Sequence, residues 1–229
     1  MSLIAQAENP EVTESLTSQV YGSLRGDIIE GELAPGTKLK VEQLRRRYEV
    51  GASPVREALS MLASDGLVDR IDQRGFRVAI VSEDDFADIL KSRCWLEERA
   101  LRESIAHGDA EWEEGVVLSF YRLSREDRSI GESGKFVANP RWEGLHKEFH
   151  YQLIAACGSP TLLEFCDKLY ERNIRYRNLA GRVSYPKRKP DTEHEEIMQA
   201  ALDRDADLAA ERLVAHYQRT GVYLQDKVS

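Results

Sequence analysis

Residues 51–62 read GASPVREALSML and combine a proline at a helix start with an apolar ladder along one helix face. The ladder consists of Val55, Ala58, Leu59 and Leu62. Its spacing of three and four residues is typical of an amphipathic helix that covers a core. Ser53 can cap this helix, and Pro54 can take its first position, where a missing N–H costs nothing. The stretch therefore predicts a short helix that leaves Arg56 off its apolar face.

The segments on either side predict a particular order of elements. Apolar residues recur every four positions from Leu16 to Ile28, which predicts a helix, and a second short helix is indicated over about residues 41–48. After residue 66 the runs LVDRI and FRVAIV flank the turn sequence DQRG, which predicts a β-hairpin. Three small helices followed by a basic hairpin predict a winged helix-turn-helix DNA-binding domain over residues 10–80.

The remainder of the chain has only helical patterns. Ser82 and the acidic residues after it form a typical helix start. We expect helices over residues 82–108, 110–127, 141–157, 160–182, 192–203 and 205–224. Residues 128–140 and 183–190 are rich in Gly, Ser and Pro and are predicted to be connectors. The fold class is therefore mainly α, with an all-α bundle of about six helices over residues 82–226 as a second domain.

Charge is distributed unevenly between these two predicted domains. The formal net charge is −8, but residues 38–77 carry nine basic and six acidic side chains and are net positive. A local positive face on an acidic body can bind a polyanion such as DNA. No apolar run approaches the ~18 residues of a membrane span, and the start of the chain lacks the order of a signal peptide. We therefore expect a cytoplasmic protein that has no membrane contact.

Cysteine usage agrees with that compartment. Cys94, Cys157 and Cys166 are an odd number of widely spaced residues in apolar, helical contexts. Reduced thiols in the core are favoured over disulfides.

Arg56 is the first candidate for DNA contact. In a helix-turn-helix the recognition helix enters the major groove by its N-terminal end, and Arg56 lies one turn into that helix. The alternative is a surface arginine paired with Glu57 or Asp65. Arg45 to Arg47 are either phosphate contacts or a solvated face, and Arg74 stands where the tip of a wing reaches DNA.

The segment VEQLRRRYEVGASPVREALSMLASDGLVDRIDQRGFRV resembles the DNA-binding region of GntR-type bacterial regulators. Arg56 falls at the family's DNA-contacting arginine, and the predicted DNA contacts are Arg45, Arg46, Ser53, Arg56 and Arg74. Ala52 stands where the family usually has an arginine, so the operator is expected to differ from the commonest half-sites. The helical second half resembles the ligand-binding domain of the FadR subfamily, the FCD domain.

Four histidines are candidates for a metal site. His146 and His150 are four residues apart, so their rings lie on one helix face, while His194 and His216 belong to two later helices. A lone histidine on an apolar face is more often a core residue than a ligand. Four on three helices, with one pair at this spacing, favour a divalent ion such as zinc or nickel. His107, beside Gly108, is expected to end a helix instead.

The FadR resemblance implies the same ligands. Many domains of this type hold a divalent metal with an Asp-x-x-x-His pair and one histidine on each of two later helices, and here His146 stands in the aspartate position. The loss of a carboxylate is expected to favour borderline ions and to strengthen the pull on an anionic ligand. Whether His146 binds the ion or only lines the pocket stays open at this point.

The resemblance also implies a small carboxylate effector. Arg93 corresponds to an arginine that the family points into the cavity, although a pair with Glu97 is the alternative. Arg175 and Arg177 are further candidates, and the stretch GDAEWEEGVVLSFYRLSR resembles regulators of dicarboxylate metabolism.

These features predict a homodimeric transcriptional regulator, usually a repressor in this family, that binds double-stranded operator DNA and leaves it when the effector binds at the metal. A metal-dependent enzyme that uses the histidines is the alternative. The absence of a general-base motif and the presence of a basic winged domain argue against it.

Overall fold

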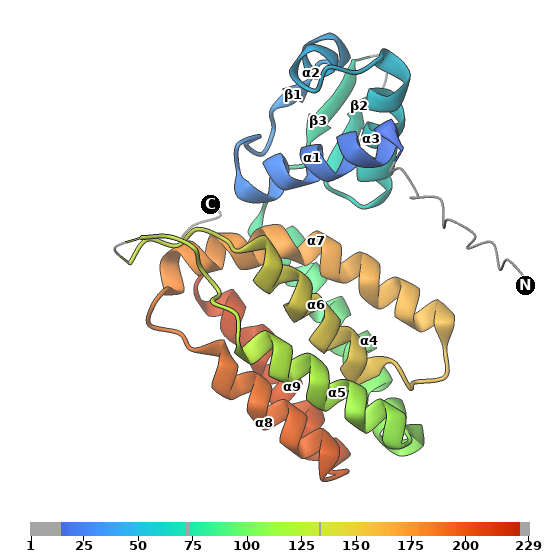
Figure 1. Ribbon diagram of the computed structural model, residues 1–229, viewed down its shortest axis with the longest axis vertical. Coiled ribbons are helices and arrows are strands. Elements are labelled where there is room, and N and C mark those ends of the chain that lie inside the picture. The colour runs from blue at the N-terminus through green and yellow to red at the C-terminus, as the bar shows by residue number, and fades with distance from the viewer. Residues whose placement is uncertain (1–14, 72–73, 133, 225–229) are drawn as a thin grey trace, which may run out of the picture.

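The computed structural model describes residues 15–71, 74–132 and 134–224, and these form two bodies (Figure 1). The smaller body comprises α1 (Leu16–Glu30), β1 (Lys38–Leu39), α2 (Val41–Arg47), α3 (Ala52–Ser64), β2 (Val68–Ile71) and β3 (Gly75–Val78). The larger body comprises α4 (Glu83–His107), α5 (Ala110–Ser124), α6 (Pro140–Ile154), α7 (Pro160–Ser184), α8 (Pro190–Leu202) and α9 (Ala206–Val222). The predicted domain limits at residues 10 and 226 lie outside the described ranges.

The smaller body is a winged helix-turn-helix. Helix α1 begins at Ser15, whose side chain accepts from the Ser18 N–H, and it ends at Gly31, where φ is +83° and only glycine fits easily. The helix packs along α3 and both bury their apolar faces in one core. That core contains Val20, Leu24, Ile28, Val55, Ala58, Leu59 and Leu62 together with residues of the sheet. The predicted ladder is therefore the buried face of α3.

The sheet contains one strand more than the predicted hairpin. β2 and β3 pair antiparallel as expected, and the two-residue β1 adds to the other edge of β3, which gives the order β1-β3-β2. In this sheet Phe76 lies opposite both Leu39 and Arg70. A two-residue strand has no alternation to detect, so only its partner reveals it.

The start of α3 also differs from the prediction. The N-cap is Gly51, which offers no side-chain cap, and Ser53 and Pro54 are the second and third residues of the helix. The prediction that Ser53 caps the helix is therefore wrong. Pro54 is tolerated in the first turn because the first N–H groups of any helix have no acceptor inside that helix.

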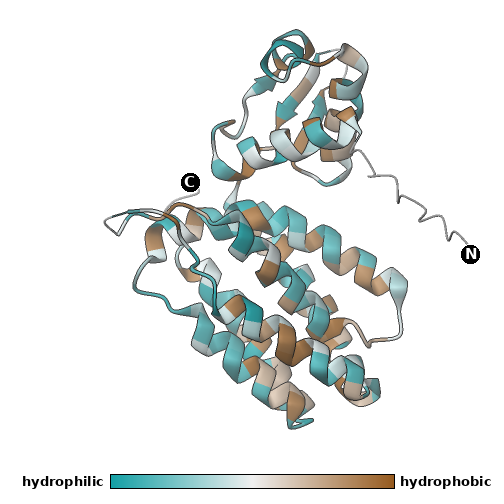
Figure 2. Ribbon diagram, viewed as in Figure 1, coloured by the Kyte–Doolittle hydropathy of each residue, from teal (hydrophilic) through white to brown (hydrophobic). Residues whose placement is uncertain are grey.

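The larger body is an all-α bundle. Helix α4 packs against α9 and α7, α5 packs against α6, and α8 packs against α9. Their buried faces share one core around Trp142, Phe149 and Leu213. Side chains at Ser82, Asp109, Asn139, Ser159 and Asp205 cap five of these helices. Hydrophilic residues run along much of α7, the helix nearest the smaller body (Figure 2).

Two of the predicted helices begin earlier than expected, α6 at Pro140 and α8 at Pro190. A proline suits the first turn of a helix as well as a connector. The three cysteines are free thiols. Among the helices of the described ranges, none combines the length and apolar character that a bilayer-spanning segment needs.

The two cores predict separable unfolding. Leu59 is fully buried in the smaller body, so Leu59→Ala is expected to lower the free energy of unfolding by about 2–5 kcal/mol. All three tryptophans, Trp95, Trp112 and Trp142, belong to the larger body. Circular dichroism of this variant should therefore show an early thermal transition that tryptophan fluorescence does not follow. Leu213→Ala, in the larger core, is the control and should move the fluorescence transition instead.

Candidate metal centre and DNA interface

Four histidine side chains meet in the middle of the larger body. His146 and His150 come from α6, His194 from α8 and His216 from α9. Each offers one ring nitrogen, and these four nitrogens all lie within 4.8 Å of one another. The Nε2 atoms of His146 and His150 are 3.2 Å apart. All four side chains are buried, and His194 is fully inaccessible to solvent.

Local sequence sets the position of the α6 pair. Asn139 accepts from the Arg141 N–H and Pro140 opens the helix, so the register of α6 is fixed at its first turn. His146 follows Trp142 by four residues and therefore lies on the same helix face. The indole of Trp142 stacks on His146 with ring centroids 4.6 Å apart. The next turn of this face brings His150 beside His146.

Three of the histidines have a partner on the side that faces away from the cluster. The Nδ1 atom of His146 lies 2.9 Å from the Tyr170 hydroxyl, and that of His150 lies 2.9 Å from the Tyr217 hydroxyl. The Nδ1 atom of His216 lies 2.7 Å from a carboxylate oxygen of Glu193. Such contacts fix ring orientation and leave Nε2 for the cluster. Neither ring nitrogen of His194 has a hydrogen-bond partner among the described residues.

Burial keeps these imidazoles neutral. Desolvation holds the pKa of His146, His150 and His194 well below the ordinary value of 6.5. It also lowers the pKa of His216 to about 4, even though the hydrogen bond to Glu193 opposes the shift. Neutral imidazole is the form that binds a metal, so the donors need lose no proton near pH 7.

This donor set fits a divalent transition-metal ion. Four neutral nitrogens converge on one point, three of them oriented by outer hydrogen bonds, and an unpartnered buried imidazole such as His194 is costly without a ligand. Imidazole suits zinc, nickel, copper and iron, so the geometry does not select one metal.

Two of the three predicted effector arginines approach the cluster. Arg93 is 1% exposed, and its Nε donates to Glu97 at 2.7 Å while its Nη2 has no partner. Its guanidinium carbon lies 4.1 Å from the centre of the Tyr217 ring. The pair with Glu97, the alternative to an effector role, is therefore present, and the guanidinium also lies over Tyr217, which contacts His150.

Arg177 approaches the cluster beside Tyr170. Its Nη2 donates to the Tyr170 hydroxyl at 2.9 Å and pairs with Glu143, while Nε and Nη1 are buried without a partner. Arg175 is not brought to the cluster, because its Nη1 donates to the carbonyl of Ala79, between the two bodies, at 2.8 Å.

Several residues around the cluster are absent from the predicted site. They are Tyr170, Tyr217, Glu143, Glu193 and Arg188. Tyr217 and Glu193 are chain neighbours of His216 and His194, which is the only sequence signal for them. His107 ends α4 as expected, with its Nδ1 2.9 Å from the Glu103 carbonyl.

The predicted DNA-contact residues are all exposed. Glu57 accepts from Thr17 and Asp65 accepts from Tyr21, so both acids that could neutralise Arg56 have other partners. The Arg56 side chain makes no hydrogen bond or ion pair with the described part of the chain, and the same holds for Ser53.

The other three candidates lie on α2 and at the hairpin tip. Arg45 and Arg46 each pair with Glu42 at 3.1 Å, and ion pairs between exposed groups are weak enough for phosphates to compete. Arg74 is exposed in the turn just before Gly75, whose φ is +89°.

Comparison with known proteins agrees with the two bodies. Residues 16–78 match the family described as bacterial regulatory proteins, gntR family, and residues 88–219 match the FCD domain. The chain is 42% identical over 204 residues to an uncharacterized HTH-type transcriptional regulator, BphR, of Paraburkholderia xenovorans, covering 89% of this chain and 83% of that protein. It is 35% identical over 201 residues to the HTH-type transcriptional repressor GlaR of Escherichia coli, covering 86% and 90%.

A solved structure shares the fold. The E. coli protein McbR/YncC superposes with a TM-score of 0.70 at 20% identity, covering 93% of this chain and 99% of that chain.

The buried neutral histidines predict a pH dependence of stability in metal-free protein. The unfolded histidines titrate near 6.5, whereas the buried rings have lower pKa values and stay neutral. The unfolded state therefore binds more protons below pH 6.5, and stability must fall as pH falls from 7 to 5, by up to about 1.4 kcal/mol per pH unit for each histidine. Urea unfolding after chelation, at pH 7, 6 and 5, measures this slope.

The matched variant is His194→Leu, which removes one buried ring with no hydrogen-bond partner. The free energy of unfolding of this variant should fall less steeply as pH falls, because unfolding takes up about one proton fewer than in the unaltered protein. Equal slopes in the two proteins would contradict the assignment.

Proposed function

Because the chain belongs to the gntR family of bacterial regulatory proteins and carries an FCD domain, we propose that it is a homodimeric repressor whose effector is a small carboxylate. The carboxylate binds at a divalent metal in the larger body and releases the operator DNA. The observation that carries this proposal is the convergence of four buried, neutral histidines whose nitrogens lie within 4.8 Å of one another. Repression is supported by the relative named as a repressor.

The four histidines are the proposed ligands of zinc or nickel. Because all four donors are neutral, the ion brings its full charge into a buried place. Glu193 reaches the cluster through His216, and Glu97 reaches it through Tyr217, which contacts His150. A bound anion compensates this charge, which is why the site attracts a carboxylate.

Arg93 and Arg177 are the proposed effector contacts. Both are buried and both keep N–H groups that have no partner in the described residues. Both guanidinium groups lie against the Tyr170 ring, and Arg93 also lies over Tyr217. Two guanidinium forks around one ion favour a dicarboxylate over a monocarboxylate. Arg175 is left out of the proposed contacts because it bonds the Ala79 carbonyl.

DNA binding is proposed to use the exposed start of α3, the basic residues of α2 and the tip of the hairpin. Arg56 reads a base edge, and Arg45, Arg46, Ser53 and Arg74 contact the phosphate backbone. The enzyme alternative finds no support among the relatives, whose names describe transcription regulators.

Replacing Arg56 tests the DNA interface. Arg56→Ala is expected to weaken operator binding by about 1–3 kcal/mol, the worth of one good base contact, without a change in thermal stability. Gel-shift titration on DNA selected by the unaltered protein gives the value. The control is Arg99→Ala, an exposed arginine on α4 that pairs with Glu103 and should leave affinity unchanged. Undiminished affinity in Arg56→Ala would remove this residue from the interface.

Removing one histidine tests the switch. His150→Ala should reduce bound metal per chain and lower the thermal midpoint, because metal binding free energy is partly folding free energy. Operator binding should persist, since the smaller body has its own core, but release by succinate, glutarate or citrate should be lost. His107→Ala, an exposed histidine at the end of α4, is the control. A His150 variant with full metal and full release would refute the site.

The oligomeric state is a further expectation. One recognition helix reads only a short half-site, so a two-fold dimer is needed for a palindromic operator. Light scattering at micromolar concentration should give twice the chain mass of 26.1 kDa. A monomer that still binds the operator tightly would contradict the dimer.

A further inference from the structure

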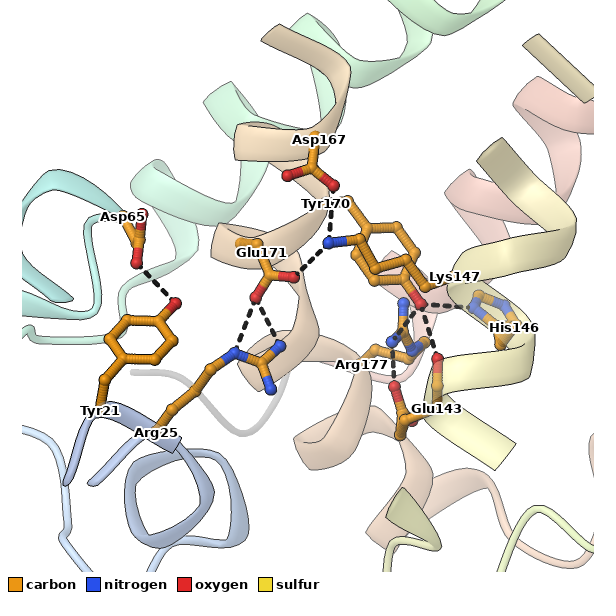
Figure 3. Close-up of polar contacts among 10 residues, drawn as sticks. All are labelled: Tyr21, Arg25, Asp65, Glu143, His146, Lys147, Asp167, Tyr170, Glu171 and Arg177. Carbon is orange, nitrogen blue, oxygen red and sulfur yellow. Dashed lines mark hydrogen bonds and ion pairs between the residues drawn. The ribbon is translucent and has the colours of Figure 1, made fainter. Parts of the chain in front are cut away.

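Helix α7 presents different faces to the histidine cluster and to the DNA-binding body (Figure 3). Tyr170 and Arg177 are seven residues apart, and both point toward α6 and the cluster. Glu171, the next residue after Tyr170, pairs with Arg25 of α1 and with Lys147 of α6. One helix therefore contacts both the proposed metal centre and the DNA-binding body.

The contacts on the cluster side are direct. The Tyr170 hydroxyl lies 2.9 Å from His146 Nδ1 and accepts from Arg177 Nη2 at 2.9 Å. Arg177 also pairs with Glu143 of α6, and all of these groups are buried or nearly so. A change in the hydrogen bonds of His146 or Arg177 therefore changes the contacts that hold Tyr170, and with it this turn of α7.

The contacts on the other side reach the first helix of the chain. Glu171 accepts from Arg25 Nε at 2.9 Å and from Arg25 Nη2 at 2.5 Å, and also from Lys147 of α6 at 2.8 Å. Further along α7, Arg182 donates to the carbonyl of Glu30, the last residue of α1, at 2.7 Å. These groups follow one stripe of α7 at helical spacing.

Helix α1 in turn positions the recognition helix α3. The two pack along their apolar faces, and the Tyr21 hydroxyl donates to Asp65, which caps the end of α3, at 2.8 Å. Tyr21 lies one turn before Arg25 on α1, so the same helix holds α7 and α3. On α7, Arg172 lies against Gly66, where an added Cβ would meet its side chain at 3.2 Å.

Space between the bodies leaves room for movement. A cleft of about 690 Å³ separates α1 from α6 and α7 and is lined by Arg25, Lys147 and Glu171 among others. The segment between the bodies is also tied to α7, through Arg175 to the Ala79 carbonyl and through the Tyr176 hydroxyl to the Ser82 N–H. A displacement of α7 thus acts on both attachments of the DNA-binding body.

We propose that α7 transmits the state of the metal centre to the recognition helix, with the Arg25–Glu171 ion pair as the coupling contact. This inference rests on the proposed function, because it assigns the route by which a carboxylate at the metal releases DNA. The carboxylate takes N–H groups of Arg177, which changes the hold of Arg177 and His146 on Tyr170. Glu171 shifts with its neighbour because a helix moves as a rigid unit, and α1 follows through Arg25.

A double-mutant cycle on operator affinity tests the route without metal or effector. Tyr170→Phe removes the hydroxyl and keeps the ring, and Arg25→Gln removes the charge on α1. The two effects on Kd should fail to add, with a deviation of about threefold or more. Glu171→Gln in place of Arg25→Gln should give the same result from the α7 side.

The matched control pairs Tyr170→Phe with Arg122→Gln. Arg122 also forms an ion pair between helices, with Glu148 at 2.9 Å, but both partners lie within the larger body. This cycle should be additive within about twofold. An additive cycle with Arg25→Gln and with Glu171→Gln, in variants whose thermal midpoints match the control, overturns the coupling.

A second measurement separates this inference from the proposed function. Release of the operator by succinate, glutarate and citrate is titrated for zinc-loaded protein, beside elemental analysis of each variant. Arg25→Gln should keep the metal content of the unaltered protein and lose most of the release, whereas retained release contradicts the coupling. Unaltered protein that binds no metal refutes the proposed metal site, and the cycle above still decides whether α7 couples the two bodies.

Discussion

Burial of four uncharged imidazoles at one point is the constraint on which the larger body depends. Rings from α6, α8 and α9 meet with their nitrogens within 4.8 Å, and burial lowers the pKa of each. A buried polar group without a hydrogen-bond partner lowers stability. His194 is such a group, because neither of its ring nitrogens has a partner among the described residues. The divalent ion that we propose here would remove that cost and would fix three helices to each other.

Charged side chains surround the histidine cluster. Acids are kept outside the imidazoles, at Glu193 behind His216 and at Glu97 behind Tyr217. Arg93 and Arg177 pair with Glu97 and Glu143, and both also keep buried N–H groups without a partner in the described residues. A site for a hard cation such as Ca²⁺ or Mg²⁺ would have carboxylate ligands, whereas imidazole nitrogens suit a transition metal.

Helix α7 also provides most of the contacts between the two bodies. Few groups cross the cleft, and most of them belong to α7, whose other face contacts His146 through Tyr170. Arg25 and Glu171 are opposite charges that are largely shielded from water, with side-chain exposures of 27% and 12%, so their pair resists solvent screening better than an exposed one. This pair is the contact through which we propose that a change at the cluster reaches α1 and α3.

Sequence alone determined the features that repeat at short range. The apolar ladders of α1 and α3, the helix-rich second half and the shared face of His146 and His150 follow from helical periodicity, and the winged motif identified the family before any coordinates. Tertiary structure decided what depends on partners far along the chain. It added β1 to the sheet, turned Arg175 to Ala79 while Arg177, two residues on, faces the cluster, and brought Tyr170 to His146. Residues two positions apart on a helix point about 200° apart around its axis. Which of Arg175 and Arg177 faces the cluster therefore depends on how the whole helix is packed.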